Sequence, residues 1–260
     1  MDLCMCLPHP VFGYQTDRQY VSCFYKYLSH YFYIVNWLIV LKVPIIKLEM
    51  ESPFDELEVD INCNNVPGIY NSHLLHYYAR VDDRFPALCL LVKHWAINAG
   101  INDAMTGTFN SYSLILLVLH FLQCAVFPPV LPNLQALFPD QFNVSVDLNK
   151  LELFKDLRPL PSSSTVGELL IAFFDYYANF DFTQNAISVA SGNIFPRSSL
   201  PPSCIRYKIF IEEPFDMQNT ARCVTRIENL NLIQSAFSNA RRALLSHKSK
   251  GPTLSSINVR

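Results

Sequence analysis

This chain has few glycines and a low fraction of charged residues, and its composition excludes several classes of protein. The 260 residues include 7 glycines, and 16% of all residues are charged. So little glycine excludes collagen-like and glycine-rich repeats. The formal net charge is -2, so the overall charge gives no argument for nucleic-acid binding. Half of the residues are hydrophobic and 13% are aromatic, which excludes wholesale disorder and supplies a sizeable core.

The chain also lacks an apolar run long enough to predict a membrane span. Residues 31–41 are interrupted by Lys42, and residues 112–127 carry His120 and Gln123 near their centre. A spanning helix needs about 20 mostly apolar residues. We therefore expect no membrane association.

The 8 cysteines are dispersed and form no C-x-x-C pair. The first residues show neither a basic segment nor a long apolar one, so they do not resemble a secretory signal. We therefore expect reduced thiols in a cytoplasmic or nuclear protein. Cys4 and Cys6 would share one face of a strand, but no further ligand cluster accompanies them, and we predict no metal site there.

Several familiar catalytic motifs are absent. The sequence contains no G-x-G-x-x-G, G-x-x-x-x-G-K-[ST], G-x-S-x-G or H-E-x-x-H. His73 and His76 lie three residues apart without an evident third ligand, which favours an ordinary place on a helix surface or interface.

Hydrophobic patterning predicts an α+β fold, with a small mixed region followed by a larger helical body. Strands are predicted at residues 3–7, 40–48 and 57–63, and a strand and turn at residues 204–215. Helices are predicted at residues 18–32, 72–78, 112–124 and 232–245, with two more near Pro86 and after Thr165. Asn71 or Ser72 is the expected N-cap of the second helix, and Leu88, Leu91, Val92 and Trp95 are the expected buried stripe of the third.

The strand at residues 57–63 is the first candidate site. Its alternation places Glu58, Asp60 and Asn62 on one face and aliphatic residues on the other. A carboxylate on the polar face of a strand is ordinarily just solvated. Asp60 becomes a functional candidate only where a partner carboxylate faces it.

Seven short segments between residues 59 and 222 carry a resemblance to a known family. They are V-D-I-N-C-N-N (59–65), I-Y-N-S (69–72), L-V-K-H-W-A (91–96), I-N-D (101–103), G-T-F-N-S-Y (107–112), E-P-F-D (213–216) and N-T-A-R (219–222). As a set they resemble the noncanonical poly(A) polymerases and terminal uridylyltransferases of the polymerase-β-like superfamily. The cytoplasmic, germline-type poly(A) polymerases are the most similar group.

The resemblance implies a partial nucleotidyltransferase palm at residues 1–66 and a helical central domain at residues 67–260. The poly(A)-polymerase-associated region would lie at about residues 162–225 of the second domain. The implied reaction transfers adenylate from ATP to an RNA 3′ end with two Mg²⁺ or Mn²⁺ ions. Because no RNA-binding module is evident, we expect an RNA-binding protein partner to supply target choice, and a cytoplasmic location.

The resemblance also implies the metal ligands. Asp60 matches the third aspartate of the family's carboxylate set, and Asp2 matches the second. The first aspartate and the Gly-Ser motif that grips the triphosphate would precede Met1, so we expect impaired catalysis in this exact chain. The alternative for Asp2 is a solvated terminal residue.

Four further residues match the family's nucleotide contacts. Asn71 matches the ribose ligand, although a helix cap would also explain it, and Lys93 matches a triphosphate ligand, although a lysine reaching solvent is ordinary. Ser111 matches a phosphate contact, and Tyr112 matches the residue that stacks on the base. Many relatives have a second lysine where this chain has Ile97.

Base choice depends on the segment around Asp216. Its carboxylate could accept a hydrogen bond from the exocyclic amine of adenine, or it could be an ordinary turn residue. The resemblance implies that uridylyl-transferring relatives carry a histidine just after the Pro-Phe-acidic run. This chain has none there, and Asn219 lies nearest that position, so we expect a preference for ATP. The alternatives are a terminal uridylyltransferase, a catalytically inactive form that acts as a partner-binding scaffold, and an unrelated helical scaffold.

Overall fold

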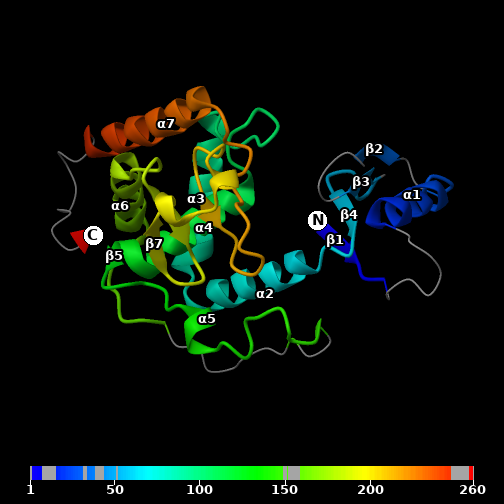
Figure 1. Cartoon of the computed structure of the whole chain (residues 1–260), viewed down its shortest axis with the longest axis horizontal. Coiled ribbons are helices and arrows are strands. Elements are labelled where there is room, and N and C mark those ends of the chain that lie inside the picture. The colour runs from blue at the N-terminus through cyan, green and yellow to red at the C-terminus, as the bar shows by residue number, and fades with distance from the viewer. Residues whose placement is uncertain are drawn as a thin grey trace. The chain divides into compact units, whose positions relative to one another are not determined.

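The computed structural model describes residues 2–7, 16–31, 34–38, 44–50, 52–148, 151, 159–246 and 258–259. The chain forms two compact units, Met1–Ser72 and His73–Arg260, and the long helix α2 (Val66–Val81) contributes residues to both (Figure 1). Helices and mixed sheets together confirm the α+β class. The predicted domain boundary at residues 66 and 67 stays a prediction. Within the described ranges, no helix is long and apolar enough to cross a membrane.

The first unit is built on a four-stranded sheet in the order β1-β4-β3-β2. β1 is parallel to β4, and the other neighbouring pairs are antiparallel. Its elements are β1 (Asp2–Met5), α1 (Asp17–Leu28), β2 (Ile34–Leu38), β3 (Ile45–Glu49) and β4 (Glu58–Cys63).

Helix α1 covers one face of this sheet. Val21 and Leu28 of the helix pack in one buried cluster with Ile46, Leu48 and Val59 of β3 and β4. Since successive side chains of a strand point to opposite faces, the residues between them lie on the other face. The sheet is therefore apolar where it meets α1 and polar on its opposite side.

One strand prediction in this unit is confirmed in part, and two helix predictions are wrong. The strand predicted at residues 40–48 is confirmed at residues 45–48, which lie in β3, while residues 40–43 lie outside the described residues. Helix α1 ends at Leu28, four residues early. Helix α2 begins at Val66, with Pro67 in its first turn, where a missing N–H costs nothing. Asn71 therefore lies inside α2 and is not its cap.

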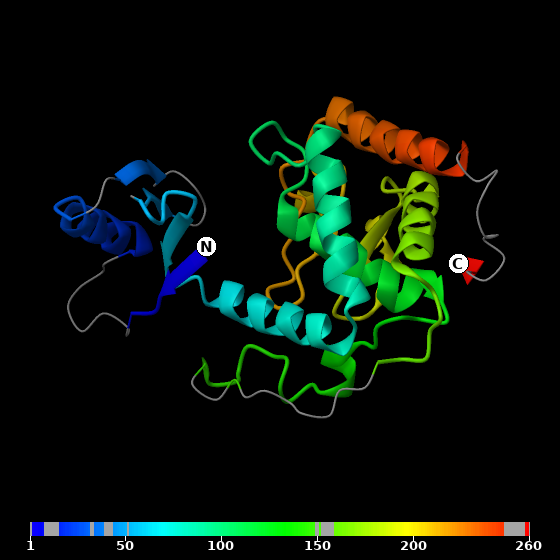
Figure 2. The ribbon, with the colours of Figure 1, turned by 180° about the vertical axis from the view of Figure 1, so that it is seen from behind.

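The second unit combines helices with a three-stranded sheet in the order β7-β6-β8. Figure 2 shows the helices of this unit from behind, with α7 in orange and α6 in yellow-green. Its helices are α3 (Arg84–Asn98), α4 (Ser111–His120), the π-helix η1 (Phe121–Ala125), α5 (Leu134–Leu137), α6 (Val166–Asn179), the short 3₁₀ turns η3 (Arg197–Ser199) and η4 (Pro202–Cys204), and α7 (Ile227–Ser246). Its strands are β6 (Asn185–Ser188), β7 (Asn193–Pro196), β8 (Ile211–Glu212), and the pair β5 (Val126–Phe127) and β9 (Asn258–Val259).

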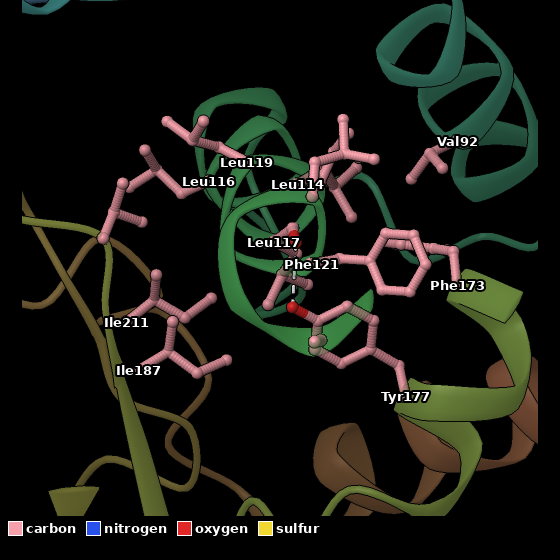
Figure 3. Packing of buried hydrophobic residues seen from close by; sticks show 14 of the residues in the cluster. Val92, Leu114, Leu116, Leu117, Leu119, Phe121, Phe173, Tyr177, Ile187 and Ile211 are labelled. Atoms are coloured by element: carbon pink, nitrogen blue, oxygen red, sulfur yellow. Dashed lines mark hydrogen bonds between the residues drawn. The ribbon is translucent and has the colours of Figure 1, made fainter. Parts of the chain in front are cut away.

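Helix α4 is the centre of this unit, as its nearly continuous apolar sequence predicts. From Ser113 to His120, all but one residue are buried. Figure 3 shows side chains of α3, α6, β6 and β8 around it. The hydroxyl of Tyr177 donates to the carbonyl of Leu117 at 2.8 Å and lies 3.0 Å from Nδ1 of His120. Burial lowers the pKa of His120 to about 3, so this imidazole is neutral.

The helix ends of this unit confirm some predictions and correct others. Asn110 caps α4, and Thr165 and Glu168 form the predicted capping box of α6. The buried stripe of α3 is partly wrong, because Leu91 is 44% exposed while Ala96 is fully buried. Residues four apart stack on one helix face, and Ala96 follows Leu88 and Val92 at that spacing.

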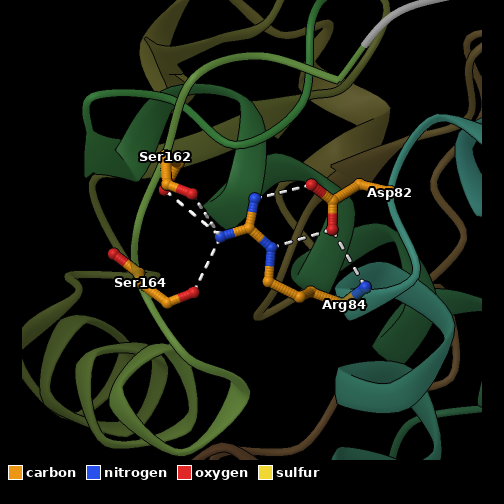
Figure 4. Close-up of polar contacts among 4 residues, drawn as sticks. All are labelled: Asp82, Arg84, Ser162 and Ser164. Atoms are coloured by element: carbon orange, nitrogen blue, oxygen red, sulfur yellow. Dashed lines mark hydrogen bonds and ion pairs between the residues drawn. The ribbon is translucent and has the colours of Figure 1, made fainter.

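A clamp of polar contacts joins the start of α3 to the segment before α6 (Figure 4). Arg84 donates to both carboxylate oxygens of Asp82, at 2.8 and 2.6 Å, and to the backbone carbonyls of Ser162 and Ser164. One guanidinium therefore ties together segments that are about 80 residues apart in the chain.

Candidate functional site

The polar face of the first sheet carries a row of charged residues in register. Asp2 of β1 is paired with Asp60 of β4, and Asp60 is paired with Lys47 of β3. Residues paired across neighbouring strands present their side chains on the same face. Two carboxylates therefore lie side by side on β1 and β4, and the condition that makes Asp60 a functional candidate is met.

Lys47 forms an ion pair with Asp60 on the flank away from Asp2. Its Nζ lies 3.6 Å from Oδ2 of Asp60, and the two side chains are 40% and 27% exposed. Half-exposed ion pairs of this kind contribute little to folding stability, about 0–1 kcal/mol. The main effect of Lys47 is therefore the positive charge that it places beside the Asp60 carboxylate.

Two buried amide oxygens lie in the same unit. Oδ1 of Asn62 and Oδ1 of Asn71 are buried and have no hydrogen-bond partner among the residues that the structure describes. Asn62 follows Asp60 by two positions on the polar face of β4, and Asn71 lies within α2. A buried acceptor without a donor costs free energy, and functional sites are a common reason to retain one.

The oxygen ligands on this face of the sheet fit a hard divalent cation. Carboxylate and amide oxygens are the ligands that Mg²⁺ prefers, and Asp2, Asp60 and Asn62 supply three such groups on adjacent strands. Within the described ranges, no three His, Cys, Asp or Glu side chains gather as a metal-binding group. The ligand roles of Asp2 and Asp60 therefore stay predictions, supported by their register.

In the second unit, the start of α4 meets the loop that follows β8. The Asn110 side chain accepts from the backbone N–H of Ser113 and donates to the carbonyl of Thr220 at 3.1 Å. The Tyr112 hydroxyl donates to Oε1 of Glu213 at 3.2 Å. Ser111 lies at the first position of the helix, where free N–H groups favour anions. Ser111, Tyr112 and residues 213–220 are thus brought together.

Glu213 organises this loop, and sequence reasoning missed it. Its side chain is buried, and Oε2 accepts from the backbone N–H groups of Phe215, at 2.7 Å, and Asp216. Burial raises the pKa of Glu213, and the nearby Asp216 charge raises it further, while the two N–H groups oppose the shift. Burial also raises the pKa of Tyr112, with the Glu213 charge as the second cause. The adjacent acidic pair followed by proline was the available signal.

The two residues predicted to contact the base differ in their exposure and hydrogen bonding. Asp216 is exposed, with its Oδ1 accepting from the N–H of Gln218. Asn219 is buried, accepts from the N–H groups of Ile211 and Ala221, and donates to the carbonyl of Ile209. Its amide is therefore used within the loop. Base contact by Asp216 stays a prediction, and the exposure of this side chain fits it. Base contact by Asn219 also stays a prediction, and the three hydrogen bonds of its amide do not favour it.

Lys93 is exposed on α3, and Ile97, one turn further, is 56% exposed. The pair therefore lies on a solvent-accessible strip of the helix. This position is compatible with binding an anion, and the phosphate role of Lys93 stays a prediction.

Comparisons with known proteins decide the family. Residues 1–80 match the family described as poly(A) RNA polymerase, mitochondrial-like, central palm domain, and residues 165–219 match Cid1 family poly A polymerase. The solved structure of a GLD-2/RNP-8 complex contains a chain 35% identical to this one, with a TM-score of 0.78, and the match covers 95% of this chain and 77% of that one.

The chain belongs to the noncanonical poly(A) polymerase and terminal nucleotidyltransferase family. A Cid1 poly(U) polymerase structure, of a histidine-to-asparagine mutant bound to MgATP, is 32% identical with a TM-score of 0.79, covering 97% of this chain and 78% of that one.

Curated members of the family are similar over most of this chain. Poly(A) RNA polymerase gld-2 of Caenorhabditis elegans is 41% identical over 211 residues, 77% of this chain and 19% of the relative. Poly(A) RNA polymerase GLD2-A of Xenopus laevis is 38% identical over 253 residues, 94% of this chain and 48% of the relative. The chain thus spans less than half the length of these curated relatives.

Proposed function

We propose that this protein is an RNA 3′-terminal nucleotidyltransferase that adds adenylate from ATP to RNA. The observation that carries the proposal is the register of Asp2 with Asp60, which sets two carboxylates side by side on the polar face of a nucleotidyltransferase sheet. The names of the curated relatives support adenylyl transfer.

Asp2 and Asp60 would hold the divalent cations through their carboxylate oxygens. Two such ions, when bound, lower the pKa of the RNA hydroxyl and stabilise the leaving pyrophosphate. Asn71 would accept a hydrogen bond from the ribose hydroxyl with its buried oxygen, which has no partner among the described residues. Mg²⁺ is supported by the nucleotide-bound Cid1 structures, and Mn²⁺ is the alternative ion.

The second unit contributes nucleotide-binding candidates of its own. Ser111 and the start of α4 would bind phosphate, with Lys93 adding a positive charge. Tyr112 would stack on the base, a contact of about 1–3 kcal/mol. The exposed carboxylate of Asp216 would accept from the amine of adenine.

Adenine preference is supported by the absence of a histidine from residues 213–220. Cid1 structures concern UTP selectivity, and one of them is a histidine-to-asparagine mutant bound to MgATP. Residues 213–220 of this chain contain no histidine, and Asn219 lies nearest the position at which the resemblance places the histidine of uridylyl-transferring relatives. We further infer that an RNA-binding protein partner supplies target choice, and the GLD-2/RNP-8 complex supports a protein partner. We also propose a cytoplasmic location.

A primer-extension assay tests the proposal. The 260-residue chain is incubated with oligo(A), Mg²⁺ or Mn²⁺, and ATP or UTP, beside an Asp60→Asn variant. Extension with ATP that the variant loses by at least about 100-fold would support metal-assisted adenylyl transfer. A UTP preference would refute the adenine assignment. Extension that survives Asp60→Asn would refute the site, and a wild-type chain without extension would favour a partner-binding scaffold.

A further inference from the structure

Lys47 is the residue that forms an ion pair with Asp60, and the proposed reaction does not use it. It lies on β3, directly opposite Asp60, while Asp2 lies opposite Asp60 on β1. Asp60 therefore has a carboxylate on one side and an ammonium on the other. The ammonium lies 3.6 Å from Oδ2 of Asp60, which is close enough for a direct ion pair.

This arrangement balances charge before any metal arrives. Two carboxylates on adjacent strands repel each other, and a like-charged pair directly opposite destabilises a sheet. The Lys47 ammonium offsets that repulsion at the central member of the row. A divalent cation that approaches Asp60 therefore meets a carboxylate that is already paired, and it is also repelled by the ammonium.

We propose that Lys47 acts as a resident cation that holds Asp60 until the nucleotide brings its own metal. The inference rests on the proposed function, because it takes Asp60 as a metal ligand. A free divalent cation competes with Lys47 unaided and binds weakly. A cation that arrives with a nucleotide triphosphate is accompanied by negative phosphate oxygens, which attract the displaced ammonium. Lys47 thereby couples metal binding to nucleotide binding.

The side-chain exposures support this exchange. Lys47 is 40% exposed, so its flexible stem can swing its ammonium off Asp60 into solvent without breaking a packed core. Its strand neighbours Ile46 and Leu48 are buried against α1 and hold the backbone of β3 in register. The lysine head can move while the position of its backbone is fixed.

The test is direct Mn²⁺ binding to the full chain, measured by electron paramagnetic resonance with and without ATP. Lys47→Met should bind free Mn²⁺ about five-fold more tightly, because one positive charge beside a divalent ion has been removed. With ATP present, the difference should shrink to less than about two-fold. Lys47→Arg keeps the charge and should resemble the wild type, as should Lys26→Met, which removes an exposed lysine from α1.

An Asp60→Asn variant distinguishes the proposed metal site at Asp60 from the proposed exchange with Lys47. Loss of Mn²⁺ binding in Asp60→Asn together with tighter binding in Lys47→Met supports the exchange. If Asp60→Asn loses binding while Lys47→Met binds free Mn²⁺ no tighter than the wild type, this inference fails and the proposed site stands. If Asp60→Asn binds as the wild type does, the metal site itself fails. Circular dichroism on each variant verifies that the sheet is folded.

Discussion

Removing the Glu213 carboxylate should unfold the loop that follows β8 (residues 213–220) and destabilise the second unit. This buried side chain accepts from Tyr112, Phe215 and Asp216. Glu213→Ala leaves two backbone N–H groups and one hydroxyl without their acceptor. Each unsatisfied buried group costs about 1–3 kcal/mol, and because the loop can admit water, we expect a total of about 3–5 kcal/mol.

Urea unfolding provides the measurement, and a double-mutant cycle with Tyr112→Phe isolates the hydroxyl contact. Tyr112→Phe alone should cost about 1 kcal/mol, and the coupling free energy should be about 1–2 kcal/mol. The neighbouring Glu212→Ala serves as a matched control and should change stability by less than about 0.5 kcal/mol. A coupling free energy near zero, or a Glu213→Ala cost no larger than that of the control, would refute this role for Glu213.

The same carboxylate predicts a pH dependence. Because burial raises the pKa of Glu213 above its ordinary value, the folded protein binds this proton more tightly than the unfolded chain does. The charged form therefore costs stability above the raised pKa, and this cost disappears as the pH falls toward the ordinary value. Wild-type stability should accordingly rise relative to Glu213→Gln when urea unfolding is repeated from neutral pH downward. A constant difference would contradict the assigned shift.

Three other contacts give predictions of graded size, each measured by urea unfolding. Arg84→Met should cost about 2–4 kcal/mol, because it leaves the Asp82 carboxylate, 6% exposed, without its partner. Burial raises the pKa of Asp82, but the hydrogen bonds and charge of Arg84 lower it by more, so the pKa lies below its ordinary value. The stability lost in Arg84→Met should therefore be present above the ordinary pKa and vanish as the pH falls through the lowered pKa. Tyr177→Phe should cost about 1–3 kcal/mol, because it leaves His120 without its buried partner. Arg241→Met should cost less than about 1 kcal/mol, because its ion pair is 41% and 36% exposed.

Local signals predicted the helix ends that depend on neighbouring residues. The Thr165 and Glu168 box and the Asn110 cap are formed by residues three positions apart, so they can be read along the chain. Of the three-stranded sheet, β8 lies within the strand and turn predicted at residues 204–215, whereas β6 and β7 were missed because they are short and β6 pairs with the distant β8. Ile187 pairs with Ile211 across 24 positions, and strands of two to four residues carry too little alternation to stand out.

The candidate site likewise has a part that local sequence patterns predicted and a part that depends on distant strand pairing. The alternation of β4 placed Asp60 on a polar face, and the family resemblance predicted Tyr112 and Asp216 as nucleotide contacts from contiguous motifs. The pairing of Asp60 with Asp2 and with Lys47 joins positions 58 and 13 residues away, which no local pattern specifies. The ion pair with Lys47 could only emerge once the strand order was known.

Asn219 shows why a motif position and a contact are different things. Its position in the sequence suggests a base-reading residue, yet its amide makes three hydrogen bonds to the backbone at Ile209, Ile211 and Ala221. Those bonds fix the loop that presents the exposed Asp216. Under adenylyl transfer, discrimination would therefore come from the carboxylate of Asp216 and from the loop shape that Asn219 maintains. An imidazole at position 219 could not make all three bonds, because its ring nitrogens cannot accept from two N–H groups and donate to a carbonyl at the same time. A change of base preference at this position would therefore require a change in loop conformation as well as a change in the base contact.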